Sequence, residues 1–166
     1  IMHRFYSFLN YFLQSMTKRY KLPIDVIHCD GSRKCGKTTN FGEYVIKDCN
    51  LFDNSGNAIK CANYVFRKNK QGRDDTFVEY QRQCSKLKVE YEVIETKHQI
   101  KFPNGSFIEF RFTNRQNLNG IPTAWSYDYA VIVYEEAYEF NEMDRYQIKY
   151  AIRGEGLKTK GIELNM

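Results

Sequence analysis

The sequence lacks the features that mark several specialised protein classes. It contains no internal repeat, no low-complexity tract and no apolar run of the roughly 20 residues that a membrane helix requires. Its 166 residues are 42% hydrophobic and 27% charged, which is an ordinary globular composition. This composition excludes a collagen-like repeat, a long disordered tail and a multidomain enzyme, and we expect one domain with no membrane partner.

Cysteine is present without the spacing of a disulfide framework or a zinc site. The five cysteines are odd in number and include no C-x-x-C pair. The three histidines, His3, His28 and His98, also lack metal-ligand spacing. We therefore predict a reducing, intracellular compartment.

Positive charge is in slight excess, with 25 lysines and arginines against 20 acids and a net charge of +5. This balance favours an anionic partner only weakly. Seven cations gather between residues 67 and 88, where they could contact the phosphates of duplex DNA or form a solvated helix face. The seven are Arg67, Lys68, Lys70, Arg73, Arg82, Lys86 and Lys88.

Alternating strand and helix patterns predict an α/β fold with a central, mainly parallel sheet and helices on both faces. Residues 1–22 read as an amphipathic helix packed on the domain, and 23–166 as the domain itself. Because the chain begins with Ile1, we expect a fragment of a longer protein. The predicted strands are 24–29, 61–67, 129–134 and 161–166, and the predicted helices are 37–48, 74–89 and 142–153.

A middle section, from Tyr91 to Thr113, alternates in polarity with the period of a β-strand. The segments 91–95, 99–102 and 106–113 carry this alternation. Asn104-Gly105 joins the last two in the manner of a type I′ turn. We predict an inserted antiparallel hairpin here.

One loop has the residues and the context of a phosphate-binding motif. Gly31-Ser32-Arg33-Lys34-Cys35-Gly36-Lys37-Thr38 fits GxxxxGK[S/T] and lies between a predicted strand and a predicted helix. In such a loop backbone N–H groups surround a β-phosphate, the lysine reaches the β- and γ-phosphates, and the hydroxyl ligates Mg²⁺. We predict binding of ATP and Mg²⁺ by residues 31–38 together with Thr39.

Two acids, Glu135 and Glu136, follow the apolar run YAVIVY directly. Such a run is typical of a strand buried on both faces of a parallel sheet, and ligands bind at the carboxyl ends of these strands. One carboxylate could hold the metal's water shell and the other could orient an attacking water. The alternative is a solvated acidic turn that caps the next helix.

Four segments in order resemble the ATPase domain of the large terminase subunit, the DNA-packaging motor of tailed bacteriophages. GSRKCGKT resembles the Walker A motif of that family, and VIVYEEA at 131–137 resembles its Walker B motif. FPNGSFIEF resembles an FPNGS-type hairpin, and LNGI at 118–121 resembles a short glycine motif that precedes Walker B.

The resemblance implies a P-loop NTPase of the additional-strand type and a role for each matching residue. Lys37 and Thr38 would bind phosphate and Mg²⁺, Glu135 would support the metal, and Glu136 would be the catalytic carboxylate. Arg33 would sense or stabilise the γ-phosphate, or else be a solvated loop cation.

The sequence departs from the family pattern at Glu135, where many P-loop ATPases have aspartate, and at Asp30, where relatives often have glycine. The domain is predicted to be truncated after Met166, without the coupling motif and the nuclease domain. The isolated fragment would then hydrolyse ATP weakly or not at all.

The resemblance also implies partners and a location. Double-stranded DNA, a portal and a small terminase subunit would be the partners, a homo-oligomer would assemble on the portal, and the setting would be the cytoplasm of an infected host cell.

Other functions stay open at this point. A helicase-like nucleic-acid ATPase fits the same motifs, and so does a nucleotide-binding module without turnover. A small-molecule kinase is disfavoured, because paired acids after a long apolar strand suit water activation better than a bound acceptor hydroxyl.

Overall fold

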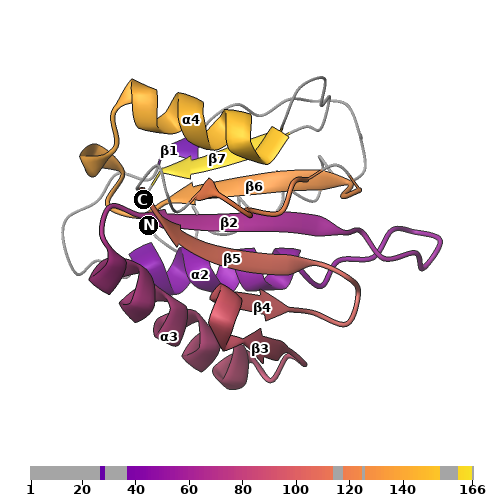
Figure 1. Ribbon diagram of the computed structural model, residues 1–166. Helices are drawn as coiled ribbons and strands as arrows, with labels where there is room; N and C mark the ends of the chain where they lie inside the picture. Colours follow the sequence, from indigo (N-terminus) through magenta and orange to yellow (C-terminus); the bar gives the residue numbers. More distant parts are fainter. Residues whose placement is uncertain (1–26, 29–36, 114–117, 125, 154–160, 166) are drawn as a thin grey trace.

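A computed structural model describes residues 27–28, 37–113, 118–124, 126–153 and 161–165 (Figure 1). The predicted helix 1–22 and the loop 29–36 lie outside the described residues. The strands are β1 (Ile27–His28), β2 (Cys61–Arg67), β3 (Glu92–Ile94), β4 (Gln99–Lys101), β5 (Phe107–Phe112), β6 (Tyr129–Tyr134) and β7 (Gly161–Asn165). The helices are α2 (Lys37–Asp48), α3 (Lys70–Leu87) and α4 (Glu142–Arg153), with short 3-10 turns η1 (Glu95–Lys97) and η3 (Ala137–Glu139).

The strands form one seven-stranded sheet in the order β1-β7-β6-β2-β5-β4-β3. The first five strands in this order pair in parallel, and β4 and β3 add to the β5 edge as antiparallel neighbours. The expected α/β fold with a mainly parallel sheet is therefore confirmed. The last strand of the chain, β7, lies between β1 and β6.

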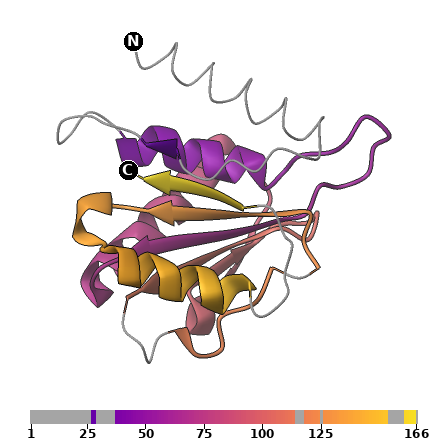
Figure 2. The ribbon, with the colours of Figure 1, turned by 90° about the horizontal axis from the view of Figure 1, so that it is seen from above.

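Helices cover both faces of the sheet, as the alternation of helix and strand predicted. Figures 1 and 2 show α4 on one face and α2 on the other, and Figure 1 shows α3 beside α2. Residues of β6 divide between two cores: Val131 and Val133 pack with α2 and α3, whereas Ile132 and Tyr134 pack with α4. This division follows from the period of two in a strand, and it explains why all of Ala130–Tyr134 is apolar.

The strand β5 belongs to the parallel core as well as to the hairpin. Its residues pair with β2 in parallel and with β4 in antiparallel register. The antiparallel segment is therefore an extension of the central sheet from its β5 edge.

The turn between β4 and β5 differs from the predicted type I′ turn. A type I′ turn needs a positive φ at both central residues, but Gly105 has φ 93° while Asn104 is not among the residues with positive φ. The Gly105 N–H donates to the Phe102 carbonyl and the Phe102 N–H donates to the Ser106 carbonyl. This pattern fits a type I turn with Pro103 at its second position, followed by a bulge at Gly105, because proline fixes a negative φ.

The helix α3 begins at Lys70, four residues before the predicted start at Asp74. Asn69 has an extended backbone, and its side-chain oxygen accepts a hydrogen bond from the Gly72 N–H at 2.7 Å. An asparagine cap of this kind sets the first turn of a helix, which the apolar periodicity of later residues does not reveal.

The described cysteines Cys49, Cys61 and Cys84 are all buried and carry free thiols. Burial raises the pKa of Cys84 to about 12 and raises that of Cys49 well above its usual range. Within the described part of the chain, no helix has the length and apolar character to cross a membrane.

Candidate functional site

The predicted phosphate-binding motif joins the carboxyl end of a parallel strand to the start of a helix. The strand β1 ends at His28 and α2 begins at Lys37, so the strand and the helix expected on either side of the motif are present. Lys37 and Thr38 occupy the first turn of α2, and Thr39 is exposed. Because the first turn of a helix leaves N–H groups unpaired, this position suits an anion. Gly31, Ser32, Arg33, Lys34, Cys35 and Gly36 lie outside the described residues.

Glu135 lies directly after β6 and is buried, with 2% of its surface exposed. Its N–H donates to the Phe66 carbonyl at 3.1 Å, which extends the pairing of β6 with β2 by one residue. Val131 and Val133 face α2 and α3, so the period of a strand directs the Glu135 side chain to that same face. The carboxylate thus lies on the side of the sheet that α2 covers.

Thr76 and Arg67 contact the Glu135 carboxylate. The Thr76 hydroxyl in α3 donates to Glu135 Oε2 at 3.0 Å. Arg67, at the end of β2, donates from Nη1 to Thr76 Oγ1 at 3.2 Å and lies 3.6 Å from Glu135 Oε2. A buried carboxylate requires such partners, because an unpaired charge away from water is costly.

Tyr80 in α3 is fully buried and close enough to Glu135 to feel its charge. Burial first, and then the negative charge of Glu135, raise the pKa of the Tyr80 phenol well above its usual range. Tyr80 therefore stays a neutral phenol and presents no competing charge to the carboxylate.

Glu136 has a left-handed backbone conformation, which is uncommon for a residue other than glycine. Its φ of 55° and ψ of 54° lie in the left-handed region, and its carbonyl accepts from the Glu139 N–H. A non-glycine residue in this region costs about 1 kcal/mol, and such residues concentrate at functional sites. The half-buried Glu136 marks the point where the chain turns from β6 into η3.

Carboxylate oxygens suit Mg²⁺, which also keeps several waters and binds substrate phosphates. Among the described residues, no group of three or more His, Cys, Asp or Glu side chains could hold a metal ion. Glu135 and Glu136 would therefore contribute to a cation site only together with other oxygen ligands. A buried carboxylate on the α2 face at the carboxyl end of β6 has the chemistry and the position for that contribution.

The FPNGS segment lies at the amino ends of the parallel strands, whereas Glu135 lies at their carboxyl ends. It precedes β5, whose first residue Phe107 pairs with Ala62 near the start of β2. Asn104 Nδ2 donates to the Ile59 carbonyl at 3.3 Å, and Ser106 Oγ accepts from the Cys61 N–H at 2.9 Å. The segment therefore stabilises the start of β2. From the rise per residue of a strand, this point is about 20 Å from the carboxyl end of β2.

The LNGI segment packs on the α4 side. Gly120 has φ 72°, and Ile121 is buried in the core shared with α4. Arg111 Nη1 donates to the Asn119 carbonyl at 3.3 Å, and Arg111 Nη2 donates to the Gly120 carbonyl at 3.4 Å. This arginine fixes the segment against β5.

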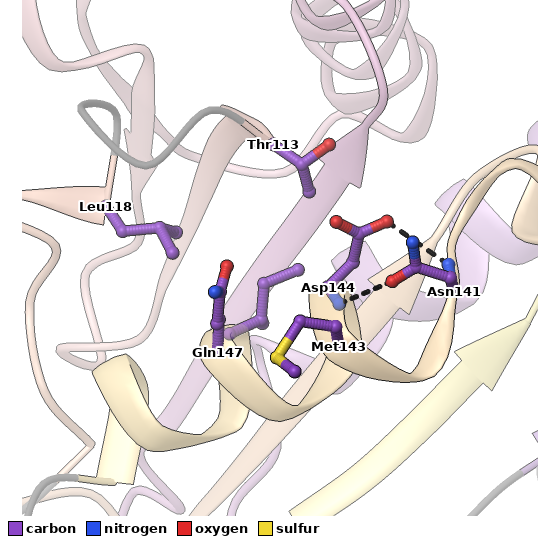
Figure 3. A pocket seen from close by; sticks show the side chains of 7 residues that line it. Thr113, Leu118, Asn141, Met143, Asp144 and Gln147 are labelled. Atoms are coloured by element: carbon purple, nitrogen blue, oxygen red, sulfur yellow. Dashed lines mark hydrogen bonds between the residues drawn. The ribbon is translucent and has the colours of Figure 1, made fainter.

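An open pocket of about 210 Å³ is lined largely by residues of α4 and of the turn before it (Figure 3). At its rim, Asn141 Oδ1 accepts from the Asp144 N–H and Asp144 Oδ2 accepts from the Asn141 N–H, a reciprocal pair that caps α4. Because Glu135 faces α2 and α3, this pocket lies on the other face of the sheet from the Glu135 carboxylate. Its lining residues are Thr113, Leu118, Asn141, Met143, Asp144, Gln147 and Ile148.

Carboxylates of the same chain pair with four of the seven cations between residues 67 and 88. Arg67 contacts Glu135, Lys68 contacts Asp144 at 2.6 Å, Arg73 contacts Asp74, and Arg82 contacts Glu79. Lys70, Lys86 and Lys88 are exposed. The positive charge offered to a polyanion by this segment is therefore smaller than the sequence count.

Sequence reasoning missed Thr76, and it assigned Arg67 to DNA contact or a solvated face. A signal for Arg67 was its place as the last residue of a buried strand, where carboxyl ends gather in a parallel sheet. Nothing local marked Thr76, because only the packing of α3 on the sheet brings its hydroxyl to Glu135.

No protein-family profile and no curated protein sequence matches the chain. Solved structures do match its fold. The HK97 bacteriophage large terminase aligns with a TM-score of 0.60 at 11% identity, over 86% of this chain and 29% of that one. The large terminase of a thermophilic bacteriophage aligns at a TM-score of 0.57 and 12% identity, and its complex with ADP at 0.59 and 14%.

The described fold is therefore that of a part of phage large terminases. The chain spans about a third of the thermophilic phage protein, with 33% of that chain covered and 86% of this one.

Proposed function

We propose that this chain binds and hydrolyses ATP as the motor domain of a large terminase that packages double-stranded DNA. One observation carries the proposal. GSRKCGKT connects the strand β1 to the helix α2, and Glu135-Glu136 directly follow the strand β6. In the sheet, β1 and β6 are parallel strands with β7 between them. The end of β1, the start of α2 and the two acids thus lie at the carboxyl ends of the parallel strands of one sheet, where open α/β folds bind their ligands, and this supports a shared site.

Each residue has a chemical role in this proposal. Backbone N–H groups of residues 31–36 would surround the β-phosphate, and Lys37 would contact the β- and γ-phosphates. Thr38 and Glu135 would hold Mg²⁺, which when bound neutralises charge on the phosphate oxygens. Glu136 would accept a proton from the attacking water, and Arg33 would meet charge that develops on the γ-phosphate.

The motor assignment draws on the fold match and on the ordered motifs. One of the matched structures is a complex of a large terminase with ADP, which supports an adenine nucleotide as the ligand. Duplex DNA, a portal, a small terminase subunit and a homo-oligomeric ring on the portal belong to the same proposal, as does the cytoplasm of an infected cell.

The first experiment tests the phosphate site. Replacing Lys37 with alanine removes the ammonium that would reach the β- and γ-phosphates, so we expect affinity for a fluorescent ATP analogue to fall at least about tenfold. Lys47→Ala is the matched control, because Lys47 is exposed at the other end of α2 and pairs with Glu43 at 2.8 Å. Equal affinity of the Lys37→Ala variant and the wild type would remove the phosphate site.

The second experiment separates turnover from binding. In the full-length protein, Glu136→Gln should bind the analogue as the wild type does and lose ATP hydrolysis by two orders of magnitude or more, roughly the contribution of a general base. Glu139→Gln, which changes a carboxylate three residues further along, is the control and should keep its turnover. Turnover retained by Glu136→Gln would refute its catalytic role and favour a nucleotide-binding module.

A further inference from the structure

We infer that Arg67 and Thr76 are positioning residues, which hold Glu135 in the orientation needed to support the magnesium of a bound nucleotide. The inference rests on the proposed function and extends it to two residues outside the sequence motifs. Its basis is the juxtaposition of three chain segments: the end of β2, the second turn of α3 and the end of β6 meet at one carboxylate oxygen, Glu135 Oε2.

The chemistry of the three groups fixes the direction of the hydrogen bonds. A guanidinium only donates, so Arg67 Nη1 donates to Thr76 Oγ1 at 3.2 Å. The hydroxyl then directs its single proton to Glu135 Oε2 at 3.0 Å. The hydrogen bonds from Arg67 through Thr76 to Glu135 therefore run in one direction, and Glu135 is the acceptor at their end.

Burial makes this arrangement rigid. Thr76 is 3% exposed and Glu135 is 2% exposed, so water cannot readily replace either partner. Thr76 has one donor, and its place in α3 is fixed by the packing of neighbouring Phe77 in the core. A carboxylate held in this way keeps its orientation whether or not a cation is near, which lowers the cost of ordering it when a metal binds.

Gly72 gives space to the arginine. A Cβ atom at Gly72 would lie 3.0 Å from three guanidinium atoms of Arg67, Nε, Cζ and Nη2. Alanine usually favours a helix over glycine by up to about 1 kcal/mol, yet here it would push the guanidinium away. Gly72→Ala therefore displaces Arg67 while its charge stays in the protein.

The test measures how magnesium promotes nucleotide binding. A fluorescent ATP analogue is titrated in EDTA and at rising Mg²⁺, and the Mg²⁺ concentration for half-maximal enhancement of binding is compared among variants. Thr76→Val keeps the shape and removes the hydroxyl, so we expect a five- to tenfold higher midpoint with unchanged affinity in EDTA. Thr76→Ser keeps the hydroxyl and lacks the methyl group, so it should have the wild-type midpoint. A merely structural role of the methyl group predicts a changed midpoint in this variant.

Two further variants complete the test. Gly72→Ala should raise the midpoint in the same direction by a smaller factor, and it decides the matter if Thr76→Val does not fold. Lys70→Gln removes an exposed cation from the start of α3 and should leave the midpoint unchanged. A shift of equal size in Lys70→Gln would show that the midpoint responds to any change at the start of α3, and it would overturn the inference.

Failure of the inference differs from failure of the proposed function. If Mg²⁺ enhances binding in the wild type and both Thr76→Val and Gly72→Ala respond at the wild-type concentration, the positioning role is wrong and the nucleotide site stands. If Mg²⁺ has no effect on binding by the wild type, the proposed magnesium site fails, and the positioning role fails with it.

Discussion

Glu109 carries a carboxyl group in surroundings that disfavour its charge. It lies in β5, is 1% exposed, and has the Arg111 Nη2 atom 3.6 Å from its Oε1. Burial raises its pKa from 4.5 to about 7, against the attraction of Arg111, which lowers it. Desolvation therefore outweighs the ion pair at this position.

This raised pKa predicts that Glu109 contributes a loss of stability as the pH rises from about 4.5 to about 7. In that interval the folded chain binds the Glu109 proton more tightly than the unfolded chain does, so the free energy of unfolding falls as pH rises. The loss is about 3 kcal/mol for a shift of this size. Glu109→Gln cannot ionise and should show a smaller difference between pH 5 and pH 8 in urea denaturation.

The control for this prediction is Glu90→Gln, which changes an exposed carboxylate and should keep the wild-type difference. The same pH dependence in Glu109→Gln and the wild type would show that Glu109 is not the group responsible.

At the scale of elements, α3 connects the candidate site to the sheet. Its Thr76 donates a hydrogen bond to Glu135, and its Tyr80 packs in the core. Its Gly72 leaves room for the Arg67 guanidinium. Its start is fixed by Asn69, whose side chain accepts from the Gly72 N–H at 2.7 Å. The register of α3 therefore decides whether Thr76 reaches the carboxylate.

Removal of the cap should weaken the whole domain. Asn69→Ala leaves an N–H group at the start of α3 without its partner, and we expect the free energy of unfolding to fall by about 1 kcal/mol. Asn69→Asp keeps an acceptor at the same position and places a negative charge near the positive end of the helix. Its unfolding midpoint should therefore equal that of the wild type or lie at a slightly higher temperature. Thermal denaturation by circular dichroism compares the three proteins, and equal midpoints for Asn69→Ala and the wild type would contradict the role of the cap.

At the scale of the whole molecule, charge balance bears on the proposed contact with duplex DNA. The net charge is +5, but the structure pairs Arg67, Lys68, Arg73 and Arg82 with carboxylates. The exposed lysines Lys70, Lys86 and Lys88 are the cations of this segment best placed to meet phosphates.

If these lysines contact duplex DNA, its affinity should fall steeply with salt. Each phosphate contact adds about 0.9 to the slope of log affinity against log salt, so replacing all three lysines with glutamine should reduce that slope by about 2 to 3. Fluorescence anisotropy of a labelled duplex, from about 50 to about 300 mM salt, measures both slopes. Equal slopes for the variant and the wild type would place the DNA contact elsewhere or exclude it.

Much of the architecture was predictable because local patterns decide local structure. The continuous apolar run of β6 predicted a strand covered on both faces, and the bounds Tyr129–Tyr134 are those observed. The periodic apolar residues of α4 predicted its bounds equally well. The turn at Asn104 was predicted wrongly, because the preceding proline favours a type I turn and the bulge at Gly105 completes the reversal.

Local patterns in the sequence predicted most of the strands and helices, and they identified the loop and the acids as candidates for phosphate and metal chemistry. The position of β7 between β1 and β6, the place of β5 in the parallel core, and the meeting of Arg67 and Thr76 at Glu135 became visible in the folded molecule alone. The reason is physical: secondary structure follows from interactions among neighbours along the chain, whereas strand order and a buried hydrogen-bond chain depend on packing between segments tens of residues apart.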